Sequence, residues 1–238
     1  MTALLRGELL KLRTTRTFAA LVGTAVGLSL LLVVVATSVE SDFALNVLFA
    51  GDFTSFFILL QGAIGMTGEW RHRTITSSVL AAPDRLRLLA AKLLSHAAAG
   101  VLLSLVVTLA TMLVGTLILS NRGQETLDVS GLADVLWRNL AIAAVLGPLG
   151  VCIGALLRNQ VVTVVGLVIV AVALEPQLLS AIPDVGQFGP LFAVPQGILG
   201  SAGVEDALAP GAAIAVSLAW VATGFAAAGA RLRRGDLV

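Results

Sequence analysis

Long runs without charged residues divide this chain, and they limit the folds that are open to it. Only 12% of its 238 residues are charged and 58% are hydrophobic, whereas a soluble domain averages about a quarter charged. A helix of roughly 20 apolar residues crosses the hydrocarbon of a bilayer. Six runs come close to that length and predict spans at residues 17–39, 46–67, 93–120, 138–157, 160–178 and 208–230. The strands of a membrane β-barrel would alternate apolar and polar residues, which runs such as LLLVVVA do not. We therefore expect an all-α membrane protein with six transmembrane helices in a single domain, residues 1–238.

The distribution of basic residues predicts how these spans are oriented. If both termini lie on one side, all of the 15 Lys and Arg residues except Arg122 and Arg138 fall in segments on that side. Basic residues gather on the cytoplasmic side of membrane proteins. We expect a multi-pass protein of the cell membrane with both termini in the cytoplasm.

The inventory of reactive residues argues against an enzyme. Neither lysine, Lys11 or Lys92, follows a glycine-rich turn of the kind that binds nucleotides. His72 and His96 are expected near the cytoplasmic surface, each without a second ligand at metal spacing. An intramembrane enzyme would need a polar catalytic pair deep in the helices, and the sequence offers none. We expect no catalytic residue, no metal, no cofactor bound by this chain and no nucleic-acid partner.

Three polar residues in or near the predicted spans are candidates for a transport pathway: Asp52, Gln61 and Glu175. An acid in the middle of a bilayer is costly, so such residues usually face a cavity or a partner. The alternative for Asp52 and Glu175 is a position at the outer interface, where the cost is small. The alternative for Gln61 is a hydrogen bond between packed helices.

Two further segments have patterns of their own. Residues 3–13 place Leu5, Leu9 and Leu12 on one stripe, which predicts an interfacial helix; an ordinary basic flank to the first span is the alternative. The stretch Glu175–Pro210 is apolar but interrupted by proline and glycine. It predicts a re-entrant or interfacial helical hairpin on the outer face, with a plain surface loop as the alternative.

The charged segment between the second and third spans, residues 69–92, is the most informative part of the chain. Ile75, Val79 and Leu80 predict an apolar patch on a short helix, and Pro83 disfavours helix just before it. Asp84 can then cap a second helix by accepting hydrogen bonds from its first turn. Helix, break and capped helix predict a rigid lateral element for a cytoplasmic partner. A structured loop that only orients the spans is the alternative.

This pattern resembles the type-2 permease subunits of ATP-binding-cassette (ABC) transporters. The resemblance lies in Glu69, Thr74-Ile75, Val79-Leu80, Pro83, Arg85 or Arg87, and Lys92, in that order, with GELLKLR before the first of six spans. Family members commonly have glycine just before the threonine, where this chain has Arg73.

The resemblance implies a fold, partners and a site. Residues around Thr74–Ala82 would be a coupling helix in a groove of a separate cytoplasmic ATP-binding subunit, which would hold ATP and magnesium. Residues 3–13 would form an elbow helix and Glu175–Pro210 an external re-entrant region. Two copies, or one copy and a sister permease, would pair in the lipid bilayer with two ATPases. Glu69 would pair with Arg71, Arg73 or a cation of the ATPase.

The expected contact residues with the ATPase all lie in the segment 69–92. They are Glu69, Arg71, Arg73, Thr74, Ile75, Ser78, Val79, Leu80, Pro83, Arg85, Arg87 and Lys92. The function expected from the resemblance is export of a hydrophobic or amphipathic substrate. A membrane channel or scaffold without a motor is the alternative.

Overall fold

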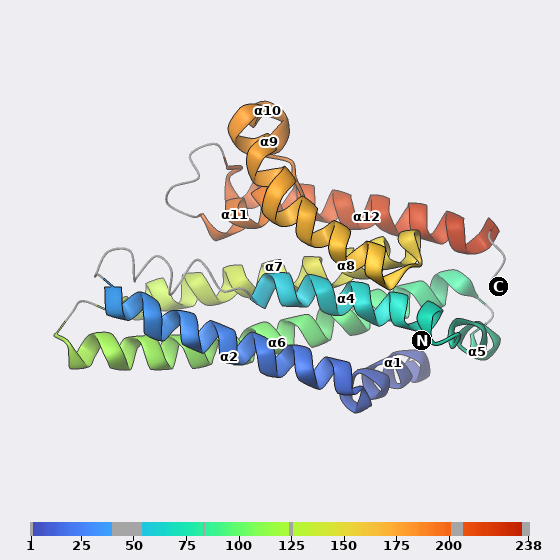
Figure 1. Cartoon of the computed structure of the whole chain (residues 1–238), viewed down its shortest axis with the longest axis horizontal. Helices are drawn as coiled ribbons and strands as arrows, with labels where there is room; N and C mark the ends of the chain where they lie inside the picture. Colours follow the sequence, from blue (N-terminus) through green and yellow to red (C-terminus); the bar gives the residue numbers. More distant parts are fainter. Residues whose placement is uncertain (1, 40–53, 83, 124–125, 201–206, 235–238) are drawn as a thin grey trace.

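A computed structural model describes residues 2–39, 54–82, 84–123, 126–200 and 207–234. Every regular element within these ranges is a helix, and the long helices run side by side along one axis (Figure 1). The elements are α1 (Thr2–Thr14), α2 (Arg16–Val39), α4 (Thr54–Arg71), α5 (Ile75–Ala81), α6 (Arg85–Asn121), α7 (Val129–Leu157), α8 (Gln160–Ile169), a π-helical turn (Val170–Leu174), α9 (Glu175–Ala181), α10 (Pro183–Gly186), α11 (Ala193–Leu199) and α12 (Pro210–Arg234). The all-α fold is as expected.

Five helical stretches of the described chain are long and apolar enough to cross a membrane. They are Arg16–Thr37, Arg85–Asn121, Val129–Leu157, Gln160–Ala181 and Pro210–Arg234. These stretches give the chain the character of a multi-pass membrane protein. The remaining predicted span, 46–67, corresponds to α4, whose 18 described residues include several polar ones and do not qualify by themselves. Residues 46–53, with Asp52 among them, lie outside the described ranges.

Two helices begin well before the predicted spans. α6 starts at Arg85 rather than at residue 93, and α7 starts at Val129 rather than at residue 138. Asp84 accepts hydrogen bonds from the first-turn amides of α6, as expected, and Asp128 does the same at Gly131 of α7. Charged residues end an apolar run but do not end a helix. At 1.5 Å per residue α6 is roughly 55 Å long, so it continues past the roughly 30 Å of hydrocarbon.

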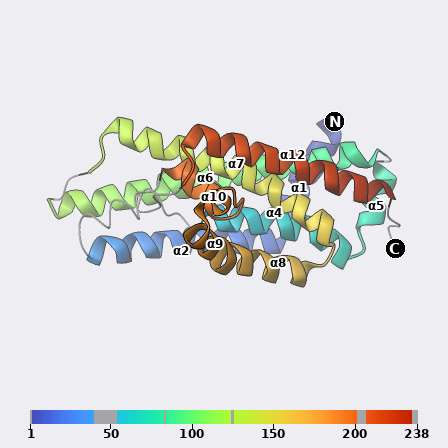
Figure 2. The same cartoon turned by 90° about the horizontal axis from the view of Figure 1, so that it is seen from above.

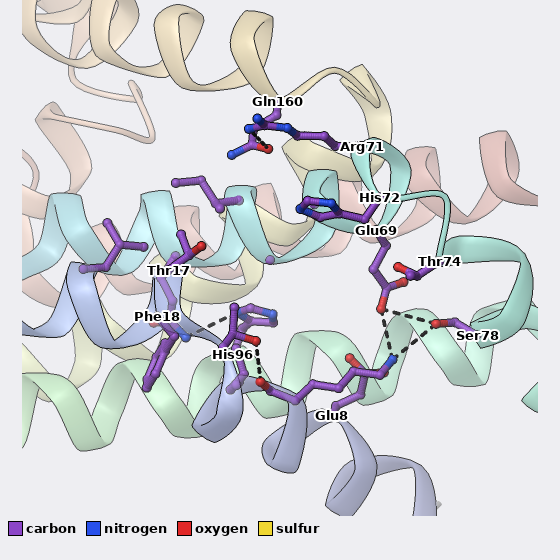
Figure 3. Close-up of a pocket in the computed structure, with 18 of the residues that line it drawn as sticks. Glu8, Thr17, Phe18, Glu69, Arg71, His72, Thr74, Ser78, His96 and Gln160 are labelled. Carbon is purple, nitrogen blue, oxygen red and sulfur yellow. Dashed lines mark hydrogen bonds and ion pairs between the residues drawn. The ribbon is translucent and has the colours of Figure 1, made fainter.

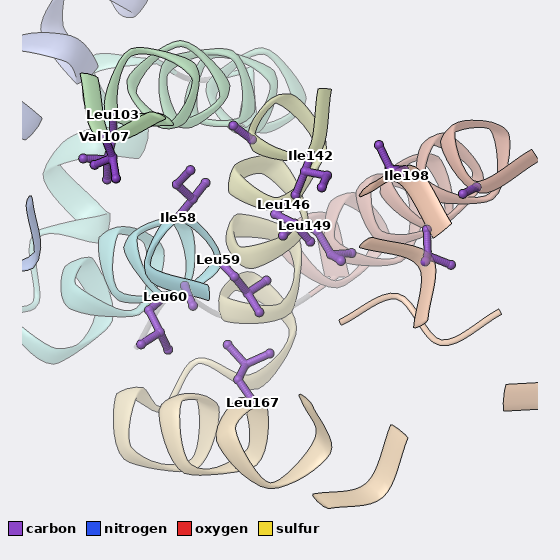
Figure 4. Packing of buried hydrophobic residues seen from close by; sticks show 14 residues of the cluster. Ile58, Leu59, Leu60, Leu103, Val107, Ile142, Leu146, Leu149, Leu167 and Ile198 are labelled. Atoms are coloured by element: carbon purple, nitrogen blue, oxygen red, sulfur yellow. The ribbon is translucent and has the colours of Figure 1, made fainter. Parts of the chain in front are cut away.

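α4 lies at the centre of the bundle, among α6, α7 and α8. The main buried cluster surrounds Ile58, Leu59 and Leu60 of α4 and is completed by residues of the neighbouring helices (Figure 4). Close approach is achieved through glycine: a Cβ on Gly154 would lie 2.8 Å from the Ala63 carbonyl, and one on Gly150 would collide with Leu59. Gly150 and Gly154, four residues apart on α7, therefore let the two helices pack closely.

The segment expected to form the external hairpin folds into short helices. α9 continues the helix of α8 through the π-helical turn, and α10 and α11 follow it. α8 begins beside α4 and runs obliquely across the bundle, and α9 and α10 extend away from it at the top of Figure 1. The Glu175 carboxylate accepts hydrogen bonds from the amides of Leu191 and Phe192, at 2.9 and 2.6 Å. Through these hydrogen bonds, Glu175 links the residues just before α11 to the end of the fifth predicted span.

Candidate functional site at the α5 end of the bundle

α5 lies at the end of the bundle where α1 begins and α12 ends, in both views of the molecule (Figures 1 and 2). Ile75 is buried with Met66 and Leu89, and Val79 faces a small internal cavity beside them. Leu80 points the other way and is 83% exposed. The predicted patch of three residues is therefore wrong, because successive helical residues turn by about 100° and residue i+5 leaves the face of residue i.

A tight turn joins α4 to α5. The amide of Thr74 donates to the Glu69 carbonyl at 2.9 Å, and Arg73 adopts a left-handed conformation with φ 57°. This conformation favours glycine. The left-handed conformation therefore gives a physical reason for the glycine that members of the permease family which this segment resembles commonly have at this position. The short helix begins at Ile75, within the expected segment.

Four charged side chains from three helices form an ion cluster under α5: Glu8, Lys11, Glu69 and Lys92. The Lys92 ammonium lies 2.8 Å from Glu8 and 2.6 Å from Glu69. Lys11 lies 2.8 Å from Glu8 and 3.1 Å from Glu69. Lys92 is only 2% exposed, and both carboxylates are buried too. The buried charges of Glu8, Glu69 and Lys92 are therefore paired, as buried charges must be, and the exposed Lys11 balances the second carboxylate.

Ser78 connects α5 to this ion cluster. Its hydroxyl accepts a hydrogen bond from Lys11 at 3.2 Å and donates one to Glu69 at 3.3 Å (Figure 3). α1, α4, α5 and α6 are thus joined through one polar network. Sequence reasoning placed Glu69, Ser78 and Lys92 at the site but took Glu8 and Lys11 for part of an interfacial helix.

The two members of the ion cluster on α1 have shifted pKa values. Burial by itself would raise the pKa of Glu8, but attraction to Lys92 and hydrogen bonds from both lysines lower it below its ordinary value. Burial would lower the pKa of Lys11, but Glu8 and Glu69 outweigh burial and raise it. Both shifts favour the charged forms, so Glu8 and Lys11 stay ionised around neutral pH.

The partners of the arginines differ from those expected. Glu69 pairs with lysines and not with Arg71 or Arg73, and Arg71 instead donates to the Gln160 side chain at 3.3 Å. Arg85 donates to the Leu232 carbonyl at the end of α12. Arg87 pairs with Asp84 at 3.0 Å on the surface. Pro83 lies outside the described residues.

A cavity of about 540 Å³ opens beside the ion cluster, between α1 and α2 on one side and α4 on the other. Gln61 and His96 lie at one part of its wall, where the Gln61 amide nitrogen is 3.3 Å from His96 Nδ1. His96 is buried inside the bundle, so its expected place near the surface is wrong. The reason is that α6 extends through the ion cluster and carries His96 one turn further in than Lys92. Gln61 makes the inter-helix hydrogen bond that was its alternative use.

Comparisons with known proteins do not identify a family, so the interpretation rests on the residues of the site. Neither a scan against models of protein families nor a search of curated proteins finds a match. Among the described residues, no three His, Cys, Asp or Glu side chains are grouped so that they could hold a metal ion.

Proposed function

We propose that this chain is the membrane-spanning permease subunit of an ABC transporter. It crosses the cell membrane six times, with α4 and the residues before it as the second span, and it pairs with a second permease. A separate cytoplasmic subunit binds ATP and magnesium and drives export of a hydrophobic or amphipathic substrate. α1 serves as the elbow helix, α5 as the coupling helix and α9 to α11 as the external re-entrant region.

The observation that carries this proposal is the attachment of α5. A coupling element must receive a force from a soluble subunit and pass it to helices in the membrane. α5 is held to α1, α4 and α6 through Ser78 and the ion cluster, and through the burial of Ile75. Hydrogen bonds to charged groups are stronger than those between neutral groups, and exposing a buried apolar side chain to water is unfavourable. A displacement of α5 therefore moves the long helices with it.

The outer face of α5 fits the role of a docking surface. Thr74, Thr76 and Ser77 are exposed, and Leu80 presents an apolar side chain at the same end of the bundle. A single apolar residue surrounded by polar ones suits the centre of an interface whose rim is polar. Arg73 lies beside this face and adds a positive charge for an acidic partner.

The experiment is affinity purification of the full chain from its own cells in mild detergent, with co-purifying proteins identified and ATPase activity measured. Leu80→Asp is the test variant, and Val129→Asp is its matched control because Val129 is 84% exposed at the other end of the bundle. We expect an ABC ATPase to co-purify with the wild type and with Val129→Asp and to be lost with Leu80→Asp. Purification of the wild type without an ATPase would instead favour the channel or scaffold.

A further inference from the structure

The cavity beside the ion cluster has the features of a binding site. Its volume of about 540 Å³ lies within the range of small-molecule sites. Its wall is divided: Leu12, Phe18, Leu21 and Ile64 supply apolar surface, while polar side chains cover the side towards α5 and α6. Such a cavity accepts a molecule that has one polar end and an apolar body.

Two residues of the wall carry buried oxygen atoms that determine what the polar end of the ligand must be. Gln61 Oε1 and Glu69 Oε2 are buried and have no hydrogen-bond partner among the described residues. Both residues line the cavity, and both atoms accept hydrogen bonds but cannot donate them. A buried acceptor without a donor is costly. A ligand that donates hydrogen bonds would therefore satisfy these two acceptors.

The charges on the ion-cluster side of the wall disfavour an acidic ligand, whereas Arg71, on the side towards α8, donates to the Gln160 side chain. Lys11 is the lysine that lines the cavity, and its three hydrogen bonds go to Glu8, Glu69 and Ser78. An ammonium group has three donors, so none of them remains for a ligand. A carboxylate placed here would meet the carboxylates of Glu8 and Glu69. A carboxylate oxygen with a vacant lone pair binds an ammonium group most strongly.

We propose that this cavity binds an amphipathic amine. Its ammonium group donates to Glu69 Oε2, and its aliphatic body lies along Ile64 and Gly68 of α4, opposite Phe18 and Leu21. Gln61 lies about 12 Å further along α4 than Glu69, at 1.5 Å per residue, so a second donor at the far end of an eight-carbon chain reaches it. That this amine is a transported substrate rests on the proposed function; that it binds does not.

The probes separate hydrogen bonding from charge and from apolar partition. Octylamine carries a charged group with N–H donors, octyltrimethylammonium has the same charge without donors, and octanoate has the opposite charge. Binding of each to the detergent-solubilised full chain is measured near neutral pH by calorimetry. We expect octylamine to bind at least about tenfold more tightly than the other two, and ω-aminooctanol to bind more tightly still.

A glycine of the wall offers a variant that fills the cavity without disturbing the bundle. Gly68 lines the cavity, and a Cβ built there meets no atom within 4 Å. Gly166 on α8 has the same open space but does not line the cavity, so Gly166→Leu is the matched control for Gly68→Leu. We expect Gly68→Leu to weaken octylamine binding at least about tenfold and Gly166→Leu to leave it unchanged.

Labelling the wild type with a diazirine-bearing alkylamine tests the site without any variant. We expect the label on the peptides that carry Phe18 and Ile64, and competition by octylamine. Labels only on other helices, equal binding of octylamine and octyltrimethylammonium, or equal loss in the two leucine variants would each overturn the site. Saturable, donor-dependent binding by a chain that purifies without an ATPase would keep the site and refute the transporter.

Discussion

Replacing Lys92 by methionine tests whether the ion cluster holds this end of the bundle together. The variant keeps the length of the side chain but removes the charge that lies 2.8 Å from Glu8 and 2.6 Å from Glu69. The two buried carboxylates would then share Lys11 alone. Breaking a buried ion pair costs about 3–5 kcal/mol, because the remaining charge is left uncompensated. For a chain of this length, a loss of that size lowers Tm by roughly 10 °C.

The matched control is Lys11→Met, in the same cluster. Lys11 contacts the same two carboxylates, but its side chain is 51% exposed and its charge is solvated. Removal of an exposed partner costs about 1 kcal/mol or less. We therefore expect a loss of stability several times smaller than for Lys92→Met, measured by thermal unfolding of the full chains in the same detergent.

A double variant identifies the cause of the loss. Lys92→Met/Glu69→Gln removes one positive and one negative charge and leaves the pair of Glu8 with Lys11 intact. If uncompensated charge is what destabilises Lys92→Met, the double variant unfolds at a higher temperature than Lys92→Met alone, with a coupling of about 1 kcal/mol or more. Equal losses for Lys92→Met and Lys11→Met, together with additive losses in the double variant, would refute the reasoning.

Three further predictions concern protonation, the turn before α5 and the packing of α7. The pKa of Glu8 is lowered on folding, so its contribution to stability is present above its ordinary pKa and is lost as pH falls through the lowered value. The difference in Tm between the wild type and Glu8→Gln should therefore be constant near neutral pH and shrink below about pH 4. Arg73→Gly relieves a left-handed conformation and should raise the free energy of unfolding by about 0.5–1 kcal/mol. The control Thr76→Gly inside α5 should instead lower it by about 0.3 kcal/mol, the difference in helix propensity between threonine and glycine; equal effects of the two in chemical unfolding would contradict the strain. Gly150→Ala places a Cβ against the backbone of α4 and should cost about 1–3 kcal/mol, whereas Gly166→Ala, in open space, should cost nothing measurable in the same thermal assay.

The helices themselves were predictable because their signals are local. Apolar runs mark the spans, and Asp84 caps α6 as its position before a helical pattern predicts. A charged residue bounds the membrane part of a helix and not the helix.

The ion cluster was only partly predictable because it depends on distant residues. Glu8 and Lys92 are 84 positions apart, and nothing in either local sequence names the other. Glu69 has two arginines close by in sequence, Arg71 and Arg73, and these are the natural candidates for its partner. Arg71 is the last residue of α4 and Arg73 follows it, and both are exposed, while Lys92 lies on a helix that packs against α4. Tertiary packing therefore decided the pairing over sequence distance.

The two sides of α4 differ in a way that bears on how a push on α5 would be distributed. On one side the glycines of α7 bring backbones into direct contact with α4, and a Cβ on Gly147 would lie 2.7 Å from the His96 carbonyl of α6. Interfaces packed this closely move as one body, because small shifts create clashes. On the other side a cavity of about 540 Å³ lies between α4 and the first turns of α2. Ser78 contacts both Lys11 of α1 and Glu69 of α4, so α5 is attached across the border between the tight part and the open part. If α5 serves as the proposed coupling helix, its displacement would act at this border, beside the proposed amine site.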